Sequence, residues 1–176
     1  MFERLKTKLA HYLLSKKYLR NGNQQIVFNK IVTDSNNFFV ILPQEEIDLN
    51  NSLDLIKYLI IHKKNVTIFL QEHKYNFFPA KDKVAFITYN LEDISRLNLP
   101  SKSLCSKLRE KNYDVVIDLN RKENTFFSAV ANVVNSKVRI GFKKENSETY
   151  YNLLYRNYNN ESELAFRNFL NFIRMF

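Results

Sequence analysis

Two neighbouring basic residues, Arg121 and Lys122, stand in a polar segment that directly follows a short apolar run. The segment reads Asn120-Arg121-Lys122-Glu123-Asn124, so five residues offer two cations, one carboxylate and two amides. A guanidinium and an ammonium can bind the phosphate or carboxylate of an anionic sugar, although Glu123 can compete for them. The composition is compatible with a site for an anionic ligand and with a solvated loop, and a solvated loop is the more common outcome.

The residues around this segment, 113–142, read as one β-α-β unit. Val115, Val116 and Ile117 form a β-branched apolar run, a helical repeat follows the polar segment, and residues 138–141 form a second run. Strands that are buried on both faces read as continuous hydrophobic runs, which is typical of a parallel sheet covered by helices.

Apolar runs and helical repeats alternate along the rest of the chain. We expect further strands over residues 38–42, 65–70, 84–89 and 153–155, and helices over 2–19, from 49 or 50 onward, from 101 or 103 to 111, and over 162–176. Residues 21–23 should end the first helix, 25–32 read as a strand or an extended linker, and 71–82 are ambiguous.

This alternation predicts an α/β fold with a single Rossmann-like, doubly wound and mainly parallel sheet of five or six strands. A chain of 176 residues fits one domain of ordinary size. We therefore expect a basic amphipathic helix over residues 1–24 and a Rossmann-like α/β domain over residues 25–176, with a second amphipathic helix at the C-terminal end.

Ligands of such sheets bind beyond the carboxyl ends of the strands, near the point where the strand order reverses. Five polar segments should meet at that edge, namely residues 43–48, 71–74, 89–91, 118–124 and 142–145. The side chains that we expect to contact a ligand there are Gln44, Glu45, Asn120, Arg121, Lys122 and Lys143.

The order "YDVVIDL", a helix and "KVRIGF" within residues 113–142 resembles the N-terminal domain of glycosyltransferase family 9, the bacterial heptosyltransferases. The resemblance covers about residues 38–155 and implies one half of a GT-B architecture. In that family a Gly-Asp pair after the first strand provides the general base for the acceptor hydroxyl. Ile47 and Asp48 stand at the matching positions, so the resemblance implies Asp48 as the base, but helix capping and the helix dipole also favour an aspartate there.

In the family, a second domain holds most of the nucleotide-sugar, and this chain ends where that domain would begin. The resemblance therefore implies a stand-alone, catalytically incomplete domain with a binding or accessory role in cell-envelope glycan assembly, such as lipopolysaccharide biosynthesis. One alternative is the acceptor-side subunit of a split glycosyltransferase, whose partner would be a separate nucleotide-sugar-binding subunit. The other alternative is a basic protein that binds a nucleic acid or a membrane surface through its N-terminal helix.

Other site chemistries have little support in the sequence. Gly22 and Gly141 are the only glycines, which excludes a dinucleotide-binding fingerprint and a P-loop, because both need glycines for close backbone contact with phosphate. The three histidines and the single cysteine lack metal-ligand spacing. We expect no cofactor and no metal.

Asp118, at the end of a strand, invites comparison with the phosphoacceptor of receiver domains, with Glu45, Glu46 and Lys143 as its counterparts. The number of strands before Asp118 does not fit that arrangement. We therefore do not expect a receiver domain.

The net charge of +9, from 27 Lys and Arg against 18 Asp and Glu, favours anionic partners. Candidate partners are an anionic glycan, a lipid-linked acceptor and a membrane surface; a nucleic acid is not expected, because no nucleic-acid-binding motif is present. The single cysteine and the absence of an apolar leader favour a cytoplasmic location.

The N-terminal helix has a predicted apolar stripe at Phe2, Leu5, Leu9, Tyr12 and Leu13. Such a stripe usually packs on its own domain, and this is the interpretation that we favour. The alternative is that the basic helix lies on an anionic membrane, which would make the protein peripheral to the inner membrane.

Overall fold

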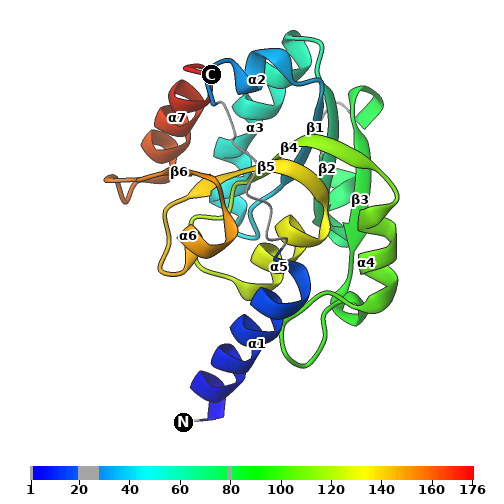
Figure 1. The fold of residues 1–176 in the computed structure, drawn as a ribbon. Helices are drawn as coiled ribbons and strands as arrows, with labels where there is room; N and C mark the ends of the chain where they lie inside the picture. Colours follow the sequence, from blue (N-terminus) through cyan, green and yellow to red (C-terminus); the bar gives the residue numbers. More distant parts are fainter. Residues whose placement is uncertain (1, 20–27, 79–80) are drawn as a thin grey trace.

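The computed structural model describes residues 2–19, 28–78 and 81–176, and of residues 2–5, 7, 17 and 77 it describes the backbone alone. Six parallel strands form one sheet in the order β3-β2-β1-β4-β5-β6 (Figure 1). The strands are β1 (Asn37–Ile41), β2 (Asn65–Gln71), β3 (Ala85–Tyr89), β4 (Asn112–Asp118), β5 (Asn135–Phe142) and β6 (Leu153–Tyr155). The predicted Rossmann-like α/β class is confirmed.

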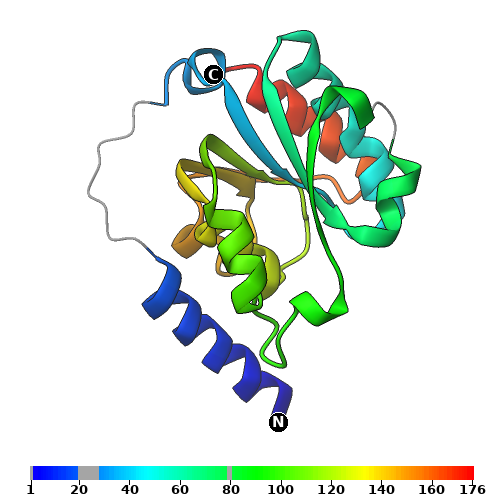
Figure 2. The same ribbon diagram turned by 90° about the vertical axis from the view of Figure 1, so that its right-hand side faces the viewer.

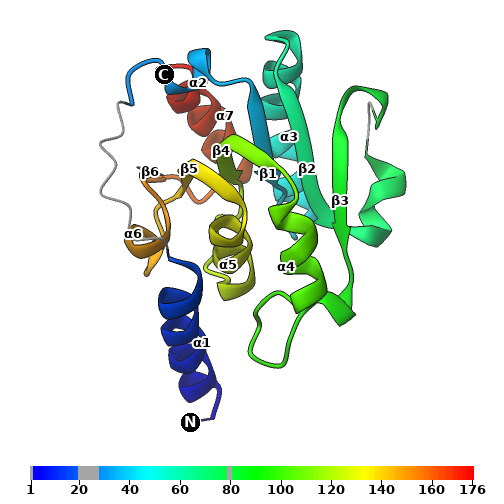
Figure 3. The same cartoon turned by 45° about the vertical axis from the view of Figure 1, so that its right-hand side comes forward.

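Helices cover both faces of the sheet (Figure 3). The α-helices are α1 (Phe2–Tyr18), α2 (Ile31–Asp34), α3 (Glu46–Ile61), α4 (Lys102–Arg109), α5 (Thr125–Val133), α6 (Ser147–Tyr150) and α7 (Ser162–Ile173). Short 3-10 turns lie at η1 (Glu72–Phe77), η2 (Lys81–Lys83) and η3 (Leu91–Asp93). Helices α4 and α5 pack on one face, and α3 and α7 pack on the other.

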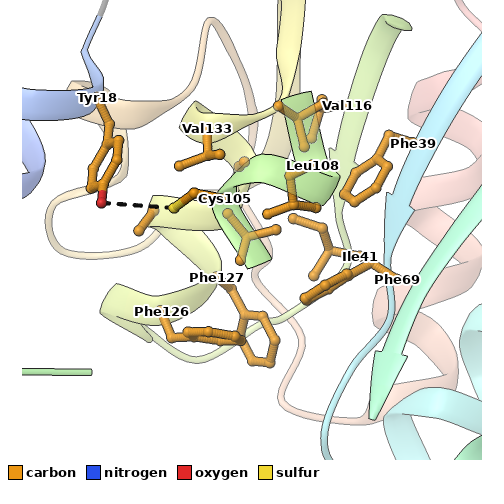
Figure 4. Close-up of a cluster of buried hydrophobic side chains, with 14 of the residues drawn as sticks. Tyr18, Phe39, Ile41, Phe69, Cys105, Leu108, Val116, Phe126, Phe127 and Val133 are labelled. Atoms are coloured by element: carbon orange, nitrogen blue, oxygen red, sulfur yellow. Dashed lines mark hydrogen bonds between the residues drawn. The ribbon is translucent and has the colours of Figure 1, made fainter. Parts of the chain in front are cut away.

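The central strands carry a core on each face because successive side chains of a strand point to opposite sides. Phe39 and Val116 face α4 and α5, together with Phe69 of β2 (Figure 4). Phe38 and Val115 belong to the core beneath α3 and α7. Burial on both sides explains the continuous apolar runs in the sequence, since a polar side chain on either face would lie in a core.

Helix α1 packs on the domain, as we favoured. Its buried residues Ala10, Leu14 and Tyr18 follow one another at a spacing of four and lie against the core that contains α5. The hydroxyl of Tyr18 lies 3.8 Å from Sγ of Cys105 on α4 (Figure 4). The i, i+4 spacing places these three side chains on one face of the helix.

The predicted apolar stripe of α1 was therefore wrong in phase. Leu9 and Tyr12 are exposed, and Leu13 is only partly buried. The buried side chains at positions 10, 14 and 18 form the contact face instead. The side chains of Phe2 and Leu5 lie outside the described residues.

Several element boundaries also differ from the prediction: β5 begins at Asn135 rather than at residue 138, and α7 ends at Ile173 rather than at residue 176. Helix α3 begins at Glu46 rather than at residue 49 or 50, because the acidic residues of segment 46–48 suit the positive end of a helix. Ile31 and Val32 are helical rather than extended. The predicted helix end at 21–23 and most of segment 25–32 fall outside the described residues.

Candidate functional site

The point where the strand order reverses lies between β1 and β4. These two strands are neighbours, but β1 continues into α3 on one face and β4 continues into α5 on the other. Their carboxyl ends border a pocket of about 190 Å³, which we call the switch-point pocket. Its lining residues are Pro43, Gln44, Glu45, Asp48, Asn120, Arg121, Lys122, Glu123, Asn124 and Phe127.

Two helices begin at this pocket. Glu45 is the residue before α3, and Asn124 is the residue before α5. The side chain of Asn124 caps α5 by accepting a hydrogen bond from the backbone N–H of Phe126 at 2.9 Å. Helix N-termini carry a partial positive charge, so both ends favour an anion in the pocket.

Asp48 lies in the first turn of α3 and is buried. Its Oδ2 accepts a hydrogen bond from Nε of Arg121 at 2.9 Å, and its Oδ1 accepts one from Nη2 of Arg121 at 2.8 Å. The hydroxyl of Ser162, the first residue of α7, donates to Oδ1 at 2.6 Å. A carboxylate offers about four lone-pair positions, and three of them are used here. This aspartate thus joins α3, the β4–α5 connection and α7.

Arg121 is held in place by the same contacts. Its Nη1 also donates a hydrogen bond to the backbone oxygen of Asn160 at 3.1 Å. Three of the five guanidinium N–H groups thereby donate to acceptors among the described residues. The bidentate pair with Asp48 fixes the plane of the guanidinium.

Lys122 pairs with Glu45 across the opening of the pocket, and both side chains are well exposed, at 80% and 51%. Gln44 is fixed more firmly. Its backbone N–H donates to Oδ1 of Asn120 at 3.3 Å, and its carbonyl oxygen accepts a hydrogen bond from Nζ of Lys74. Burial lowers the pKa of Lys74.

Glu123 does not compete for the two cations as we expected. Its carboxylate accepts hydrogen bonds from the backbone N–H and the side-chain amide of Asn146, at 3.0 and 2.9 Å. It also lies 3.7 Å from Nε2 of His11 on α1. The carboxylates that pair with Arg121 and Lys122 come from the β1–α3 segment, because the two connections meet at the sheet edge.

The segment 118–124, which we call the elbow, is anchored by Asp118 at the end of β4. The carboxylate of Asp118 is 0% exposed and accepts four hydrogen bonds. Oδ1 receives the backbone and side-chain N–H groups of Asn120, at 3.0 and 2.8 Å. Oδ2 accepts hydrogen bonds from Nζ of Lys144 at 2.7 Å and from the hydroxyl of Tyr151 at 2.5 Å. A carboxylate saturated in this way positions the elbow and is not accessible as a phosphoacceptor.

Lys144 and Tyr151 were not predicted. The Lys144 side chain is only 4% exposed and also donates to the carbonyl oxygen of Asn120 at 2.9 Å. Burial, followed by the negative charge of Asp118, raises the pKa of Tyr151 well above its ordinary value. Gly141 makes room for this ring, since a Cβ on Gly141 would lie 3.2 Å from Cδ1 of Tyr151.

The structure brings together five of the six residues that we expected to contact a ligand, together with Asp48. The sixth, Lys143, does not line the pocket; its side chain is 26% exposed and pairs with the exposed Glu148. Consecutive side chains of an extended segment alternate in direction, so Lys144 rather than its neighbour reaches Asp118. Asp118 ends a buried strand, and a buried carboxylate is usually paired with a cation. The position of Asp118 in the sequence could therefore have indicated a lysine partner such as Lys144.

The part of the chain that the structure describes contains no group of three or more His, Cys, Asp or Glu side chains arranged to hold a metal ion. Within the same residues, no helix is long and apolar enough to cross a membrane.

Comparison with known protein families matches residues 6–174 to DUF6913, a family of unknown function. The chain belongs to the DUF6913 family. No curated protein and no solved structure matches it. The DUF6913 match carries no activity, so the resemblance to family 9 glycosyltransferases stays a prediction.

Proposed function

We propose that this DUF6913 protein is a binding module that holds a small anionic group in the switch-point pocket, without transferring sugar by itself. The resemblance of residues 113–142 to family 9 glycosyltransferases supports a ligand from cell-envelope glycan assembly, such as a sugar phosphate. The observation that carries the proposal is the position of the pocket between the carboxyl ends of β1 and β4, where the helices α3 and α5 begin.

The charges around the pocket suit an anion that replaces Glu45 as the partner of Lys122. Lys122 is well exposed, and an exposed ion pair contributes little free energy, so a ligand phosphate can replace the Glu45 carboxylate at low cost. The two helix N-termini and the guanidinium of Arg121 add further donors.

The volume of the pocket limits the size of the ligand. Pockets for drug-sized molecules usually measure about 300–1,000 Å³, whereas this one measures about 190 Å³. A phosphate or one sugar ring fits within this volume, whereas a whole nucleotide-sugar would extend beyond it. This limit favours a binding or accessory role over transfer of sugar from a nucleotide-sugar.

The contacts of Asp48 also favour binding over catalysis. A general base must approach the hydroxyl from which it takes a proton. The Asp48 carboxylate is buried and bonded to Arg121 and Ser162, which leaves little room for such a hydroxyl.

A titration of the ¹⁵N-labelled protein tests the proposal by NMR, with inorganic phosphate, glucose 1-phosphate and uncharged glucose as probes. Saturable shifts should appear in the amides of residues 43–48 and 120–124 for the two phosphates and not for glucose. Lys122→Gln should weaken binding, whereas Glu45→Gln should strengthen it about two- to fivefold by removing the competing carboxylate. Lys57→Gln is the matched control, because Lys57 forms an exposed pair with Asp54 on α3.

Shifts that do not saturate, or equal affinities for the Lys122 and Lys57 variants, would refute the proposed site. Sugar transfer by the purified chain would refute the non-catalytic role. Transfer that requires an added nucleotide-sugar-binding subunit, and that is lost in Asp48→Asn, would instead identify one subunit of a split glycosyltransferase.

A further inference from the structure

Among the described residues, strand β3 pairs only with β2, so it forms one edge of the sheet. No described residue outside β2 forms a hydrogen bond with the backbone of residues 85–88. In Figure 2 this edge faces the viewer, with η1 and α3 to one side of it and α4 to the other. A row of free backbone N–H and C=O groups is a template on which another strand can pair.

The composition of β3 is that of a strand that is paired on both sides. It reads Ala-Phe-Ile-Thr-Tyr, without a charge or a proline, and residues 86–88 are half-buried. Proteins usually protect free edges with charges, prolines, bulges or very short strands. The opposite edge follows this rule, because β6 has only three residues. The β3 edge does not follow this rule, because its five residues are apolar, aromatic or β-branched and therefore favour strand pairing.

A second pocket, which we call the strand-edge pocket, opens beside β3 and measures about 360 Å³. It is lined by residues 85–88 of the strand, by Tyr113 at the start of β4, and by Lys107 and Lys111 at the end of α4. It runs along most of β3 and shares no lining residue with the switch-point pocket. A strand added to β3 would direct alternate side chains toward this pocket.

Tyr113 gives an independent sign that the strand-edge pocket has an occupant. The side chain is only 7% exposed, and its hydroxyl is the one buried side-chain N or O atom among the described residues without a hydrogen-bond partner. Burial raises the pKa of Tyr113, and the nearby Thr67 hydroxyl offsets part of this shift without forming a hydrogen bond of normal geometry. A buried polar group without a partner is costly, and a ligand acceptor would satisfy it.

The charges at this edge determine the kind of occupant. Lys107 and Lys111 are exposed at the pocket, and Glu110 between them is the one acidic residue that lines it. Lys81 and Lys83 flank the start of the strand, with Asp82 between them. A second copy would bring another net charge of +9, whereas an acidic chain complements the edge.

We propose that the β3 edge binds an extended acidic segment of a partner protein. The segment pairs with β3 through its backbone and places one side chain in the strand-edge pocket, where its carboxylate or carbonyl accepts a hydrogen bond from the hydroxyl of Tyr113. Backbone pairing supplies affinity and the pocket supplies specificity, as in other cases of strand addition.

The test uses a phage-displayed library of random nine-residue peptides, selected against the immobilised full-length protein. The enriched peptides should be acidic, with β-branched or aromatic residues at alternate positions. The most enriched peptide is then synthesised with a fluorescent label, and its affinity is measured by anisotropy. Tyr113→Phe should weaken binding about three- to tenfold by removing one hydrogen bond, without lowering the stability of the free protein.

Two further measurements separate strand addition from other modes of binding. N-methylation of the peptide at one set of alternate residues should abolish binding, whereas methylation of the other set should not, because only every second N–H faces β3. The double variant Lys107→Glu/Lys111→Glu should lose affinity, and Lys57→Glu on α3 is the matched control.

Failure to enrich any peptide would overturn the proposal, as would equal tolerance of the two N-methylated sets. Wild-type affinity in both Tyr113→Phe and the double lysine variant would also overturn it. A dimer that is detected by sedimentation and dissociated by the peptide would assign the edge to a second copy instead.

Discussion

Replacement of Lys144 by methionine tests the anchor of the elbow directly. Lys144 and Asp118 form an ion pair at 2.7 Å with side-chain exposures of 4% and 0%. Methionine keeps most of the volume of lysine and removes the charge. The carboxylate of Asp118 then remains buried with the hydroxyl of Tyr151 and the N–H groups of Asn120 as its only donors.

We expect Lys144→Met to lower the free energy of unfolding by about 3–5 kcal/mol, because removal of one partner leaves an uncompensated charge in the interior. With an m value of about 2 kcal/mol/M in urea, a loss of 4 kcal/mol shifts the midpoint by about 2 M. Urea titration followed by circular dichroism measures this shift. The adjacent Lys143→Met is the matched control and should leave the midpoint almost unchanged, because Lys143 pairs with the exposed Glu148.

A second variant distinguishes loss of the charge partner from loss of packing. Asp118→Asn/Lys144→Met removes both charges, so it should be more stable than Lys144→Met alone. Equal midpoints for Lys144→Met and Lys143→Met would refute the anchoring role of the pair. Asp118→Asn is also measured alone. A double variant whose loss equals the sum of the losses of Asp118→Asn and Lys144→Met would refute the coupling between the two side chains.

Three further predictions concern neighbouring contacts. Gly141→Ala should lower stability by about 1–3 kcal/mol, because the new Cβ crowds the ring of Tyr151, and this loss should largely disappear in a Tyr151→Leu background when both are measured by urea titration. Arg121→Met should lower the free energy of unfolding by about 2–3 kcal/mol, less than Lys144→Met, because Asp48 keeps its hydrogen bond with Ser162. An unchanged urea midpoint would contradict the role of Arg121 as the partner of Asp48. Burial raises the pKa of Tyr89 to about 12 from 10.0. As the pH rises, Tyr89 therefore loses its proton in the unfolded chain before it does so in the folded protein. Its contribution to the free energy of unfolding is fully present below pH 10 and should fall by about 1.4 kcal/mol per pH unit between pH 10 and pH 12. Urea midpoints at pH 9 and pH 11, with Tyr89→Phe as the control, measure this contribution.

The sheet could be predicted because its central strands are buried on both faces. Val115 and Val116 face opposite cores, so burial on both sides required an unbroken apolar run that is visible in the sequence. The start of α3 was harder to predict, because Glu46 precedes the first apolar repeat of the helix. Its acidic first turn was the available sign. The buried face of α1 includes the small residue Ala10, which a search for large apolar side chains does not select.

The residues of the switch-point pocket could be predicted from topology, but their pairing could not. The carboxyl ends of parallel strands meet at one edge, so Gln44 and Asn120 were expected there from the strand assignments alone. The partner of Arg121 is Asp48, which lies 73 positions earlier in the chain, and its choice depends on the direction of individual side chains. Glu123 is closer in sequence to Arg121 but turns toward Asn146 instead.

The exposure of the three ion pairs determines which part of the pocket can respond to a ligand. The Asp118–Lys144 pair is buried, and an entering anion cannot reach Lys144 without exposing Asp118. The Asp48–Arg121 pair is partly buried, so it can add donors to a ligand while it keeps its own geometry. Only the Lys122–Glu45 pair is exposed enough to exchange partners. Two ion pairs that keep their geometry and one that can exchange its carboxylate suit a site that binds a small anion reversibly. The salt dependence of such binding should therefore arise mainly from Lys122.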